Sequence, residues 1–387
     1  MQNLKVVRMN RIEKLIDTLC PYGVEWKKVG DIADISRGIV MSKEYINEHP
    51  GNYSVYSSQT VNNGEIGKID TYNFDGEYLT WTTDGAYAGA VFYRNGKFSI
   101  TNVCGLINIK NKEHINTKYV KYILSINTQS HVTRGMGNAK LMSNVMASIE
   151  IPVPPIEIQN EIVHILDHFT ELEEELEEEL EARRKQYEYY RDTLLTFDDS
   201  VEWKKLEDIA TRIKGTPITA TQMKLIAADD GEIKIFAGGK TVVNAHESDI
   251  PNANITKVPA VLVQSRGTID FVYYDKPFTF KNEMWAYTFE NQITVKYIYY
   301  VLKNNVEHFR KITESMGAFP QIALPDTEKY KIPLPDIKTQ ERIVNILDRF
   351  EALCNDITLG LPAEIEARHK QYEYYRDKLL TFKRKSA

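Results

Sequence analysis

Two long stretches of the chain carry apolar residues at helical spacing. In the first, apolar or aromatic residues recur in alternating steps of four and three from Ile158 to Phe197, with one 4–4 break around Leu176. This is the pattern of a coiled-coil seam with one stutter. Pro154 and Pro155 precede the seam and suit the start of a helix. We therefore predict a helix of about 40 residues, roughly 60 Å long.

The second stretch, from Ile343 to Phe382, repeats this seam with four more residues. Gly360 and Pro362 fall inside it, and because proline costs about 3 kcal/mol in a helix interior we expect a kink or a short break there. We predict that the two helices pair as an antiparallel coiled coil with pseudo-two-fold symmetry; the alternative is that each packs only on its own block. The predicted seam residues are Ile162, Phe169, Leu176, Tyr187, Tyr190, Leu194, Ile343, Phe350, Ile357, Tyr372, Tyr375 and Leu379.

The blocks before each helix show a different pattern. Short runs rich in β-branched and aromatic residues, such as YSVYSS (53–58), GEYLTWT (76–82) and AVLVQS (260–265), are separated by Gly, Asn and Asp. Helical stretches near 117–128 and 294–311 follow these runs. We therefore predict an α+β fold with two tandem globular blocks whose sheets are mainly antiparallel.

The chain repeats itself in the order block, helix, block, helix. The tails ARRKQYEYYRDTLLTF (182–197) and ARHKQYEYYRDKLLTF (367–382) agree at fourteen of sixteen positions. In the blocks, Gly85 aligns with Gly267, and Asn102 with Asn282, whereas the residues between these anchors diverge. One scaffold is thus used twice to present different residues. The predicted domains are 1–155 and 200–335 for the blocks, and 156–199 and 336–387 for the helical segments.

Composition and charge narrow the possible classes of protein. The 387 residues carry a net charge of −6, and no apolar run is long enough for a transmembrane helix. Cys20, Cys104 and Cys354 are widely spaced, which excludes a disulfide framework and fits a reducing cytoplasm. The segment 156–197 alone holds 4 basic and 13 acidic residues. Because the acidic residues are concentrated in that segment, the negative net charge of the chain does not exclude a nucleic-acid partner.

No motif for catalysis stands out. AGGKT (237–241) lacks the first glycine of a phosphate-binding loop, so a Gly-Gly hairpin turn is the better interpretation. Asp326 and Asp336 could be read as part of a Mg²⁺ nuclease site, yet Asp336 stands where a helix cap is expected. A methyltransferase would need a glycine-rich cofactor loop, which is missing, and the histidines have no ligand spacing. We predict no metal site and no catalytic residues.

The repeated segments resemble a known family. The tandem blocks, the I-P-[VL]-P approach to Gln159 and Gln340, and the twin KQYEYYRD…LLTF tails resemble the specificity subunit of type I restriction–modification systems, as does LCPYGVEWKKVGDIA (19–33). The resemblance covers essentially the whole chain. It implies that the blocks are target recognition domains, each reading one half of a bipartite double-stranded DNA sequence, and that the helices set the spacer between the halves.

The resemblance also implies the partners. Two modification subunits would dock on the helices, bind S-adenosylmethionine and methylate adenine-N6. Restriction subunits would add translocation and cleavage that use ATP and Mg²⁺. The chain itself would hold no cofactor and would be a non-catalytic subunit in the cytoplasm.

Recurring polar, glycine-supported loops are the candidates for contact with DNA, because base edges are read by such groups. Gln59 and Asn138 are suited to adenine, and Arg134 and Arg266 to guanine. The full set of candidates is Ser57, Ser58, Gln59, Thr60, Thr83, Asp84, Gly85, Arg134, Gly135, Asn138 and Lys140 in the first block and Gly238, Gly239, Lys240, Thr241, Ser265, Arg266, Gly267, Gly317, Phe319 and Gln321 in the second.

Two other functions stay open at this point. A self-contained DNA-modifying enzyme would use the same loops, although the missing cofactor loop disfavours it. A coiled-coil scaffold could instead bind two proteins through its blocks. Salt-dependent DNA binding separates the scaffold from a DNA-reading subunit.

Overall fold

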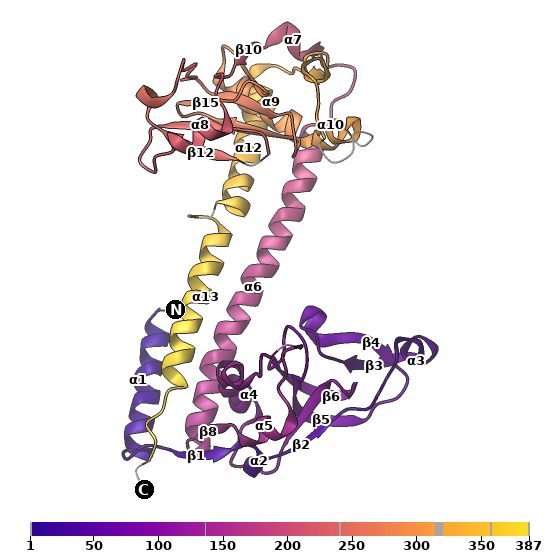
Figure 1. The fold of residues 1–387 in the computed structure, drawn as a ribbon, viewed down its shortest axis with the longest axis vertical. Helices are drawn as coiled ribbons and strands as arrows, with labels where there is room; N and C mark the ends of the chain where they lie inside the picture. The colour runs from indigo at the N-terminus through magenta and orange to yellow at the C-terminus, as the bar shows by residue number, and fades with distance from the viewer. Residues whose placement is uncertain (1, 136, 240, 314–319, 357, 386–387) are drawn as a thin grey trace. The chain divides into compact units, whose positions relative to one another are not determined.

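The computed structural model describes residues 2–135, 137–239, 241–313, 320–356 and 358–385, and it divides into two compact units (Figure 1). The first unit comprises residues 1–175 and 365–387, and the second comprises residues 176–364. Each unit therefore contains one block together with parts of both helical segments. The domain boundaries drawn from the sequence stay a prediction. Among the described residues, no helix combines the length and hydropathy needed to cross a membrane.

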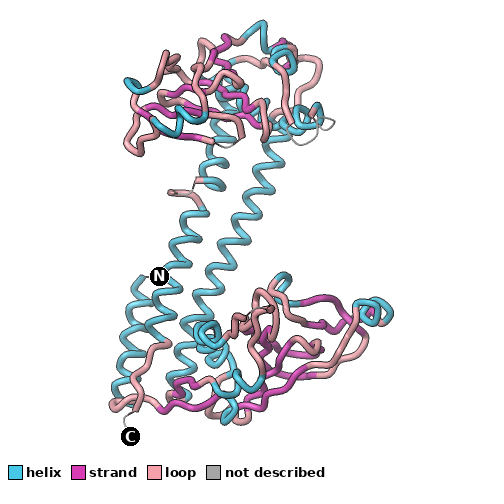
Figure 2. The backbone as a smooth tube through the Cα atoms, viewed as in Figure 1, coloured by secondary structure: helices cyan, strands magenta, loops and turns pink. Residues whose placement is uncertain are grey.

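The first unit is built on a mixed sheet of six strands in the order β2-β7-β5-β6-β3-β4. Its strands are drawn in magenta in Figure 2. All neighbouring strands are antiparallel except β3 and β6. The elements are α1 (Gln2–Leu19), β1 (Glu25–Lys28), α2 (Val29–Ile32), β2 (Ala33–Arg37), α3 (Lys43–Glu48), β3 (Pro50–Tyr56), η1 (Val61–Gly64), β4 (Glu65–Ile69), β5 (Phe74–Thr82), β6 (Val91–Ile100), β7 (Cys104–Ile109), α4 (Thr117–Asn127), η2 (Thr128–His131), α5 (Ser143–Ser148), β8 (Glu150–Val153) and α6 (Ile156–Leu194).

The second unit repeats this plan with the sheet divided in two, in the orders β10-β16-β13-β14 and β12-β11-β15. The long strand β6 of the first unit corresponds to two short strands here, because Pro277 falls between them and cannot donate to a sheet ladder. The elements are β9 (Trp203–Lys205), α7 (Leu206–Ile209), β10 (Thr211–Lys214), α8 (Ala220–Leu225), β11 (Ile233–Phe236), β12 (Val242–Ala245), η3 (Glu247–Asp249), β13 (Ala260–Gln264), β14 (Asp270–Tyr274), β15 (Phe278–Phe280), β16 (Trp285–Thr288), α9 (Gln292–Asn304), α10 (Val306–Ile312), α11 (Leu324–Glu328), β17 (Lys331–Pro333), α12 (Ile337–Asn355) and α13 (Leu361–Leu379).

These elements confirm the predicted α+β class and mainly antiparallel pairing. They also explain two of the sequence repeats. The first strand of each block pairs with the last one, β1 with β8 and β9 with β17. The two strands that close each block are therefore formed by the EWKK segments (25–28 and 202–205) and by the I-P-[VL]-P segments (151–154 and 332–335). Pro152 and Pro333 are tolerated because each ladder has only two strands, which leaves an edge free of pairing.

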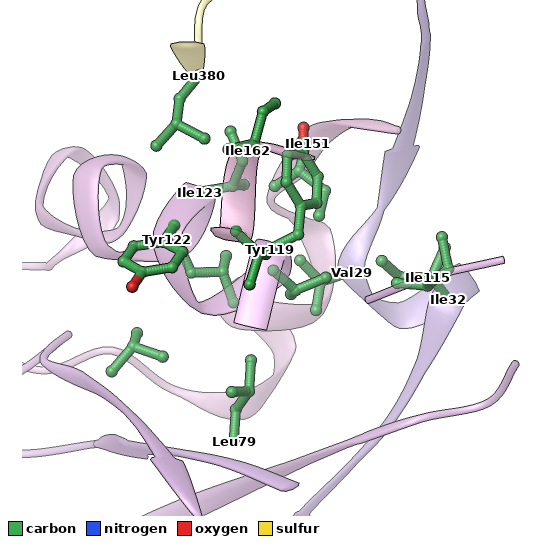
Figure 3. Close-up of a cluster of buried hydrophobic side chains, with 14 of the residues drawn as sticks. Val29, Ile32, Leu79, Ile115, Tyr119, Tyr122, Ile123, Ile151, Ile162 and Leu380 are labelled. Atoms are coloured by element: carbon green, nitrogen blue, oxygen red, sulfur yellow. The ribbon is translucent and has the colours of Figure 1, made fainter. Parts of the chain in front are cut away.

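A helix that crosses each sheet supplies most of the core. In the first unit α4 buries Tyr119, Tyr122 and Ile123 between the sheet and α6, where they meet Leu79 and Ile162 (Figure 3). In the second unit α9 buries its aromatic residues in the same way. The apolar face of each helix thus fixes a block to the beginning of α6 or of α12.

A buried polar contact accompanies each of these apolar faces. The Tyr122 hydroxyl donates to Asp167 Oδ1 at 2.6 Å, and Lys118 Nζ lies 2.5 Å from Asp167 Oδ2. In the second unit Tyr300 donates to Asp348, whose carboxylate also pairs with a lysine, Lys296. Burial and the neighbouring carboxylate raise the pKa of the Tyr122 hydroxyl, so it stays protonated and remains a donor. The segment ILD, which occurs at 165–167 and again at 346–348, therefore contributes the carboxylate at the contact between block and helix.

Each unit contains its own antiparallel helix pair. In the first unit the Phe169 ring on α6 stacks on Tyr375 of α13 at 5.4 Å between ring centroids, and Glu173, further along α6, meets His369, earlier on α13. In the second unit Tyr190 of α6 stacks on Phe350 of α12 at 5.5 Å. The same ring contact is made twice with the partners exchanged, so the predicted antiparallel seam is confirmed within each unit.

The seam residues differ in burial. Ile162, Phe169, Ile343 and Leu379 are buried, whereas Tyr190 is 38% exposed despite its stacking. Leu176, Tyr187, Leu194, Phe350, Tyr372 and Tyr375 are half-buried. Ile357 lies outside the described residues.

The second helical segment is broken, as proline and glycine predicted. Helix α12 ends at Asn355 and α13 begins at Leu361. Asp356 accepts hydrogen bonds from the backbone of Thr358 and Leu359, and a Cβ on Gly360 would lie 2.6 Å from the Ala352 carbonyl oxygen. Only glycine fits so close to the end of α12.

Helix α1 is not among the predicted elements. It lies beside α13 and the beginning of α6 in the first unit (Figure 1), where Lys378 Nζ pairs with Glu13 at 2.9 Å and Ile12 is fully buried. The sequence analysis missed this helix, although Ile12, Leu15, Ile16 and Leu19 stand at helical spacing.

The hydrogen bond between Tyr122 and Asp167 in the first unit can be tested by removing a single oxygen atom. Tyr122→Phe removes the hydroxyl and leaves the half-buried Asp167 carboxylate with Lys118 as its remaining partner, so we expect the free energy of unfolding of that unit to fall by about 1.5–3 kcal/mol. Chemical denaturation followed by hydrogen exchange of α4 peptides measures this. Tyr300→Phe is the matched variant and should loosen α9 instead; loosening of both helices by either variant would contradict two independent joints.

Candidate nucleic-acid interface

Two loops of the first block donate to one backbone carbonyl, and a third loop is hydrogen-bonded to the second of them. The oxygen of Val103, between β6 and β7, accepts hydrogen bonds from the Ser58 hydroxyl and from the Thr83 hydroxyl, the latter at 2.8 Å. Thr83 in turn begins the loop that follows β5, and its carbonyl oxygen accepts from Leu141 N at 2.9 Å. The candidate segments at 57–60, 83–85 and 133–141 are therefore held together at one end of the sheet.

The last two of these loops are joined by backbone hydrogen bonds. Gly85 N donates to the Ala139 carbonyl oxygen at 2.9 Å, and Thr133 and Lys140 exchange both of their backbone hydrogen bonds across the base of a hairpin. Gly85 has a φ of +94°, a conformation that glycine adopts without strain. A glycine is therefore required for the turn that brings the amide to the hairpin.

The second block repeats three of these hydrogen bonds. Gly267 N donates to the Pro320 carbonyl oxygen at 2.9 Å, Ile322 N donates to the Ser265 carbonyl oxygen at 3.0 Å, and the Ser265 hydroxyl donates to the Glu283 carbonyl oxygen at 2.6 Å. Gly267 also has a positive φ, of +79°. The sequence alignment of Gly85 with Gly267 therefore reflects a shared loop framework.

The residues presented on this framework differ between the blocks. At one bridge position Asp84 faces Lys140, with the ammonium 3.8 Å from the carboxylate, whereas the corresponding pair in the second block is Arg266 and Gln321. Arg266 is exposed and makes no side-chain hydrogen bond or ion pair within the described part of the chain. The charges of Asp84 and Lys140 therefore neutralise each other, whereas the guanidinium of Arg266 is left without a neutralising partner among the described residues.

Burial corrects the expectation for two candidates. The side chains of Thr83 and Ser265 are fully buried, and their hydroxyls are used by the loop framework, so they position the loops and do not face a ligand. Gln59, expected to pair with adenine, donates its amide to the Glu65 carbonyl oxygen at 2.7 Å. Its function in the structure is likewise to hold its own loop.

Other candidates lie at accessible positions. Arg134, Gly135 and Asn138 are exposed at the tip of the hairpin, and Arg134 donates to Gln129 at 3.2 Å. Thr60 precedes η1, and Gly238, Gly239 and Thr241 form the turn between β11 and β12, which confirms the Gly-Gly hairpin. Lys240, Gly317 and Phe319 lie outside the described residues.

The sequence analysis missed the tip of the first loop. Val61, Asn62 and Asn63 are exposed between Thr60 and Gly64, and both asparagines have a φ of +51°. The Asn-Asn-Gly triplet is itself a turn signal that could have extended the candidate segment by three residues.

Reactive groups of other kinds are scarce at this end of the block. Within the described ranges, no group of three or more His, Cys, Asp or Glu side chains is placed to hold a metal ion. Burial raises the pKa of the Cys104 thiol to about 12, so it stays neutral and behaves as a small apolar residue. Asp336, considered above for Mg²⁺, instead caps α12 through the backbone amides of Lys338 and Thr339.

Comparisons with known proteins agree with this duplicated framework. The model of the type I restriction modification DNA specificity domain matches residues 21–182 and again residues 199–367. A putative type I specificity subunit of Mycoplasma pneumoniae is 36% identical over 91% of this chain and 96% of its own length. A second one from the same organism is 32% identical over 82% of this chain and 97% of its own length.

A solved structure shares the fold. The crystal structure of a type I restriction–modification system S subunit from M. genitalium superposes with a TM-score of 0.64, covering 92% of this chain and 96% of that one at 17% identity.

The two framework glycines offer a matched test. Gly85→Ala and Gly267→Ala add a methyl group without a close contact, the nearest atom being 3.7 Å away at Gly267, but they force alanine to a positive φ. We expect each to lower the free energy of unfolding by about 1 kcal/mol and to speed amide exchange in its own loops. Gly135→Ala is the control, because its Cβ also meets open space and its φ is not positive; equal losses in all three variants would contradict a conformational cause.

Proposed function

Because the chain belongs to the type I restriction–modification DNA specificity family, as the two matches to its domain model establish, we propose that each loop end reads one half of a bipartite DNA target. The observation that supports this most directly is the duplicated loop framework. Two copies of one hydrogen-bond network present different side chains, which is what reading two unrelated half-sites requires.

The exposed groups suit the edges of bases. A guanidinium such as that of Arg266 can donate twice to guanine O6 and N7, and an amide such as that of Asn138 or Gln321 can pair with adenine N6 and N7. Sequence is read through such contacts in the major groove, while contacts to phosphate mainly position the protein. In this proposal the exposed side chains of the loops contact the base edges, and the hydrogen-bonded framework positions the loops in the major groove.

We assign the phosphate contacts largely to partner subunits. The first block is only slightly basic, with 17 basic and 14 acidic residues in 1–155. Since phosphate neutralisation supplies most non-specific affinity for DNA, this chain alone should bind weakly. Two modification subunits that carry S-adenosylmethionine and methylate adenine-N6, and restriction subunits that use ATP and Mg²⁺, would complete the complex.

The helices are proposed to set the spacer and to dock the modification subunits. One helix, α6, is continuous over 39 residues and belongs to both units, so a change in its length acts on both. The tails that end α6 and α13 are nearly identical in sequence, which suits two copies of one partner. A Tyr side chain in each tail is largely exposed, 67% at Tyr189 and 64% at Tyr374.

Exchange of one block tests the modular reading of DNA. We expect that replacing residues 202–331 with the block of another family member changes one half-site and leaves the other intact, because no hydrogen bond among the described residues joins the two loop frameworks. Sequencing of methylated adenines in cells with the modification subunit reports both half-sites at once. A chimera that assembles and changes both halves would refute this reading.

Catalysis should be confined to the partners. The purified chain is expected to show no methyl transfer and no ATP hydrolysis, while the complex with modification subunits methylates DNA that contains the target. A methyl-transfer assay with labelled S-adenosylmethionine measures both, and the complex is the positive control. Methylation that copurifies with the chain alone through several columns would favour a self-contained enzyme.

The length of α6 can be tested as a ruler. Duplicating Glu173–Leu176 lengthens the helix by about 6 Å, close to two base-pair rises. The far end also turns by a net of roughly 40°, against nearly 70° for two base pairs, a mismatch that modest bending can absorb. We expect the unread spacer to widen by one or two base pairs with both half-sites kept. Methylome sequencing shows the spacer directly; an unchanged spacer with full activity would exclude the helix as the ruler.

A further inference from the structure

The first recognition loop differs from its counterpart in length and in support. Ser57 N donates to the Gly64 carbonyl oxygen at 3.0 Å and closes the loop, whereas in the second block Ala237 N donates to the Thr241 carbonyl oxygen at 2.9 Å and closes a shorter one. The additional residues of the first loop form its exposed tip, in which Val61 is 72% exposed.

A buried arginine lies directly beneath this tip. Arg94 on β6 is 4% exposed, and its guanidinium carbon lies 3.6 Å from the centre of the Tyr56 ring. Its Nη2 donates to the Asn63 carbonyl oxygen at 2.7 Å, and its Nε donates to the Thr80 hydroxyl at 3.1 Å. The tip is therefore tied through its own backbone to the middle of the sheet.

This arrangement is unusual for a buried cation. Arg94 forms no ion pair with a carboxylate among the described residues, and its Nη1 has no hydrogen-bond partner there. Burial lowers the pKa of the guanidinium, although a group that starts above 12 stays charged at neutral pH. A buried charge is costly when it is not paired. A residue held at such a cost is better explained by the loop that it supports than by stability of the sheet.

The second block shows the same position without the arginine. Tyr274 on β14 occupies the place of Arg94, and it packs edge-on against Phe236, the counterpart of Tyr56, at 5.2 Å between ring centroids. The rings of Tyr274 and Phe236 thus pack beneath the shorter loop of the second block. The arginine and the longer loop thus occur together in one block, and both are missing from the other.

We propose that Asn62 and Asn63 are base-reading residues of the first half-site and that Arg94 is the positioning residue that presents them. This inference rests on the proposed function, since it assumes that the loop end faces DNA. It names a reading element outside the candidate segments drawn from the sequence, and it assigns the element an A·T pair because a side-chain amide pairs with adenine N6 and N7.

The backbone conformation makes the asparagines suitable for this task. Asparagine is one of the few residues other than glycine that adopt a positive φ readily, and both of these asparagines are exposed. Gly64 follows at a φ of +82° and is buried. A Cβ placed on it would lie 3.2 Å from Arg94 Nη2. The turn is thus fixed on its inner side and open on its outer side.

The side chains can be removed without disturbing the turn. Asn62→Gly and Asn63→Gly keep a residue that adopts a positive φ and delete only the amide. In the complex with modification subunits, we expect the discrimination at one A·T pair of the first half-site to fall by roughly 5- to 100-fold for one of these variants. Duplexes with each target base pair replaced in turn, assayed for binding and methyl transfer, give this value.

The positioning residue needs a different readout. Arg94→Met keeps the length of the side chain but loses the charge and both donors, so discrimination at that same pair should fall while the second half-site is read as before. Arg94→Lys, which can still donate to the Asn63 carbonyl oxygen, should restore part of it. Tyr274→Phe is the control in the second block and should change neither half-site.

The outcomes separate the inference from the proposed function. If the unaltered complex shows no sequence preference, the proposed function fails. If it reads its target and both glycine variants keep full discrimination at every position, Asn62 and Asn63 do not read bases and the inference is overturned. Loss at both half-sites in Arg94→Met, with a lower melting temperature, would show that Arg94 serves only the fold.

Discussion

Backbone hydrogen bonds hold the recognition loops of both blocks together, and this is the constraint on which the rest of the structure depends. Gly85 N to Ala139 O and Gly267 N to Pro320 O are the same bond made in two sequences that share little else at this position. Apart from the two glycines and the buried hydroxyls of Thr83 and Ser265, this framework is built from backbone amides and carbonyls, so it does not require particular exposed side chains. The exposed side chains can therefore diverge while the loops keep their places.

The joints between blocks and helices follow the opposite rule. There the contacts are made by side chains: Tyr119 donates to the Pro152 carbonyl oxygen at 3.0 Å, and Tyr297 donates to the Pro333 carbonyl oxygen at the same distance. Gln159 is buried and its amide donates to two backbone carbonyl oxygens. Such contacts allow only one residue type, so these segments repeat along the chain with little change.

This contrast decides how much of the fold could be predicted from sequence. The helices, the break near Gly360 and the strands of each block leave local signals, namely periodicity, proline and glycine, and β-branched runs. The seam pairs within each unit also followed, because Phe169 and Phe350 stand at seam spacing. Helix α1 was missed although its apolar residues stand at helical spacing, and the helix α13 beside it lies at the other end of the sequence.

The candidate site was harder to predict for a related reason. Sequence identifies polar loops but not which polar atoms are already used. Thr83 and Ser265 were expected to face DNA, and their burial shows that they serve the framework. Asn62 and Asn63 were not selected, since an Asn-Asn-Gly triplet also occurs in ordinary turns. Only the buried contact of Arg94 with the Asn63 carbonyl distinguishes this turn from others.

Variation in the blocks also reaches below the loops. The position of Arg94 is a tyrosine in the second block, and a proline a few residues later divides the strand that is continuous in the first. A longer loop needs support from beneath, and that support must come from the strand it crosses. Changing the loops of a block therefore involves the sheet beneath them as well as the exposed side chains, so we expect whole blocks, rather than single loops, to be the units of exchange.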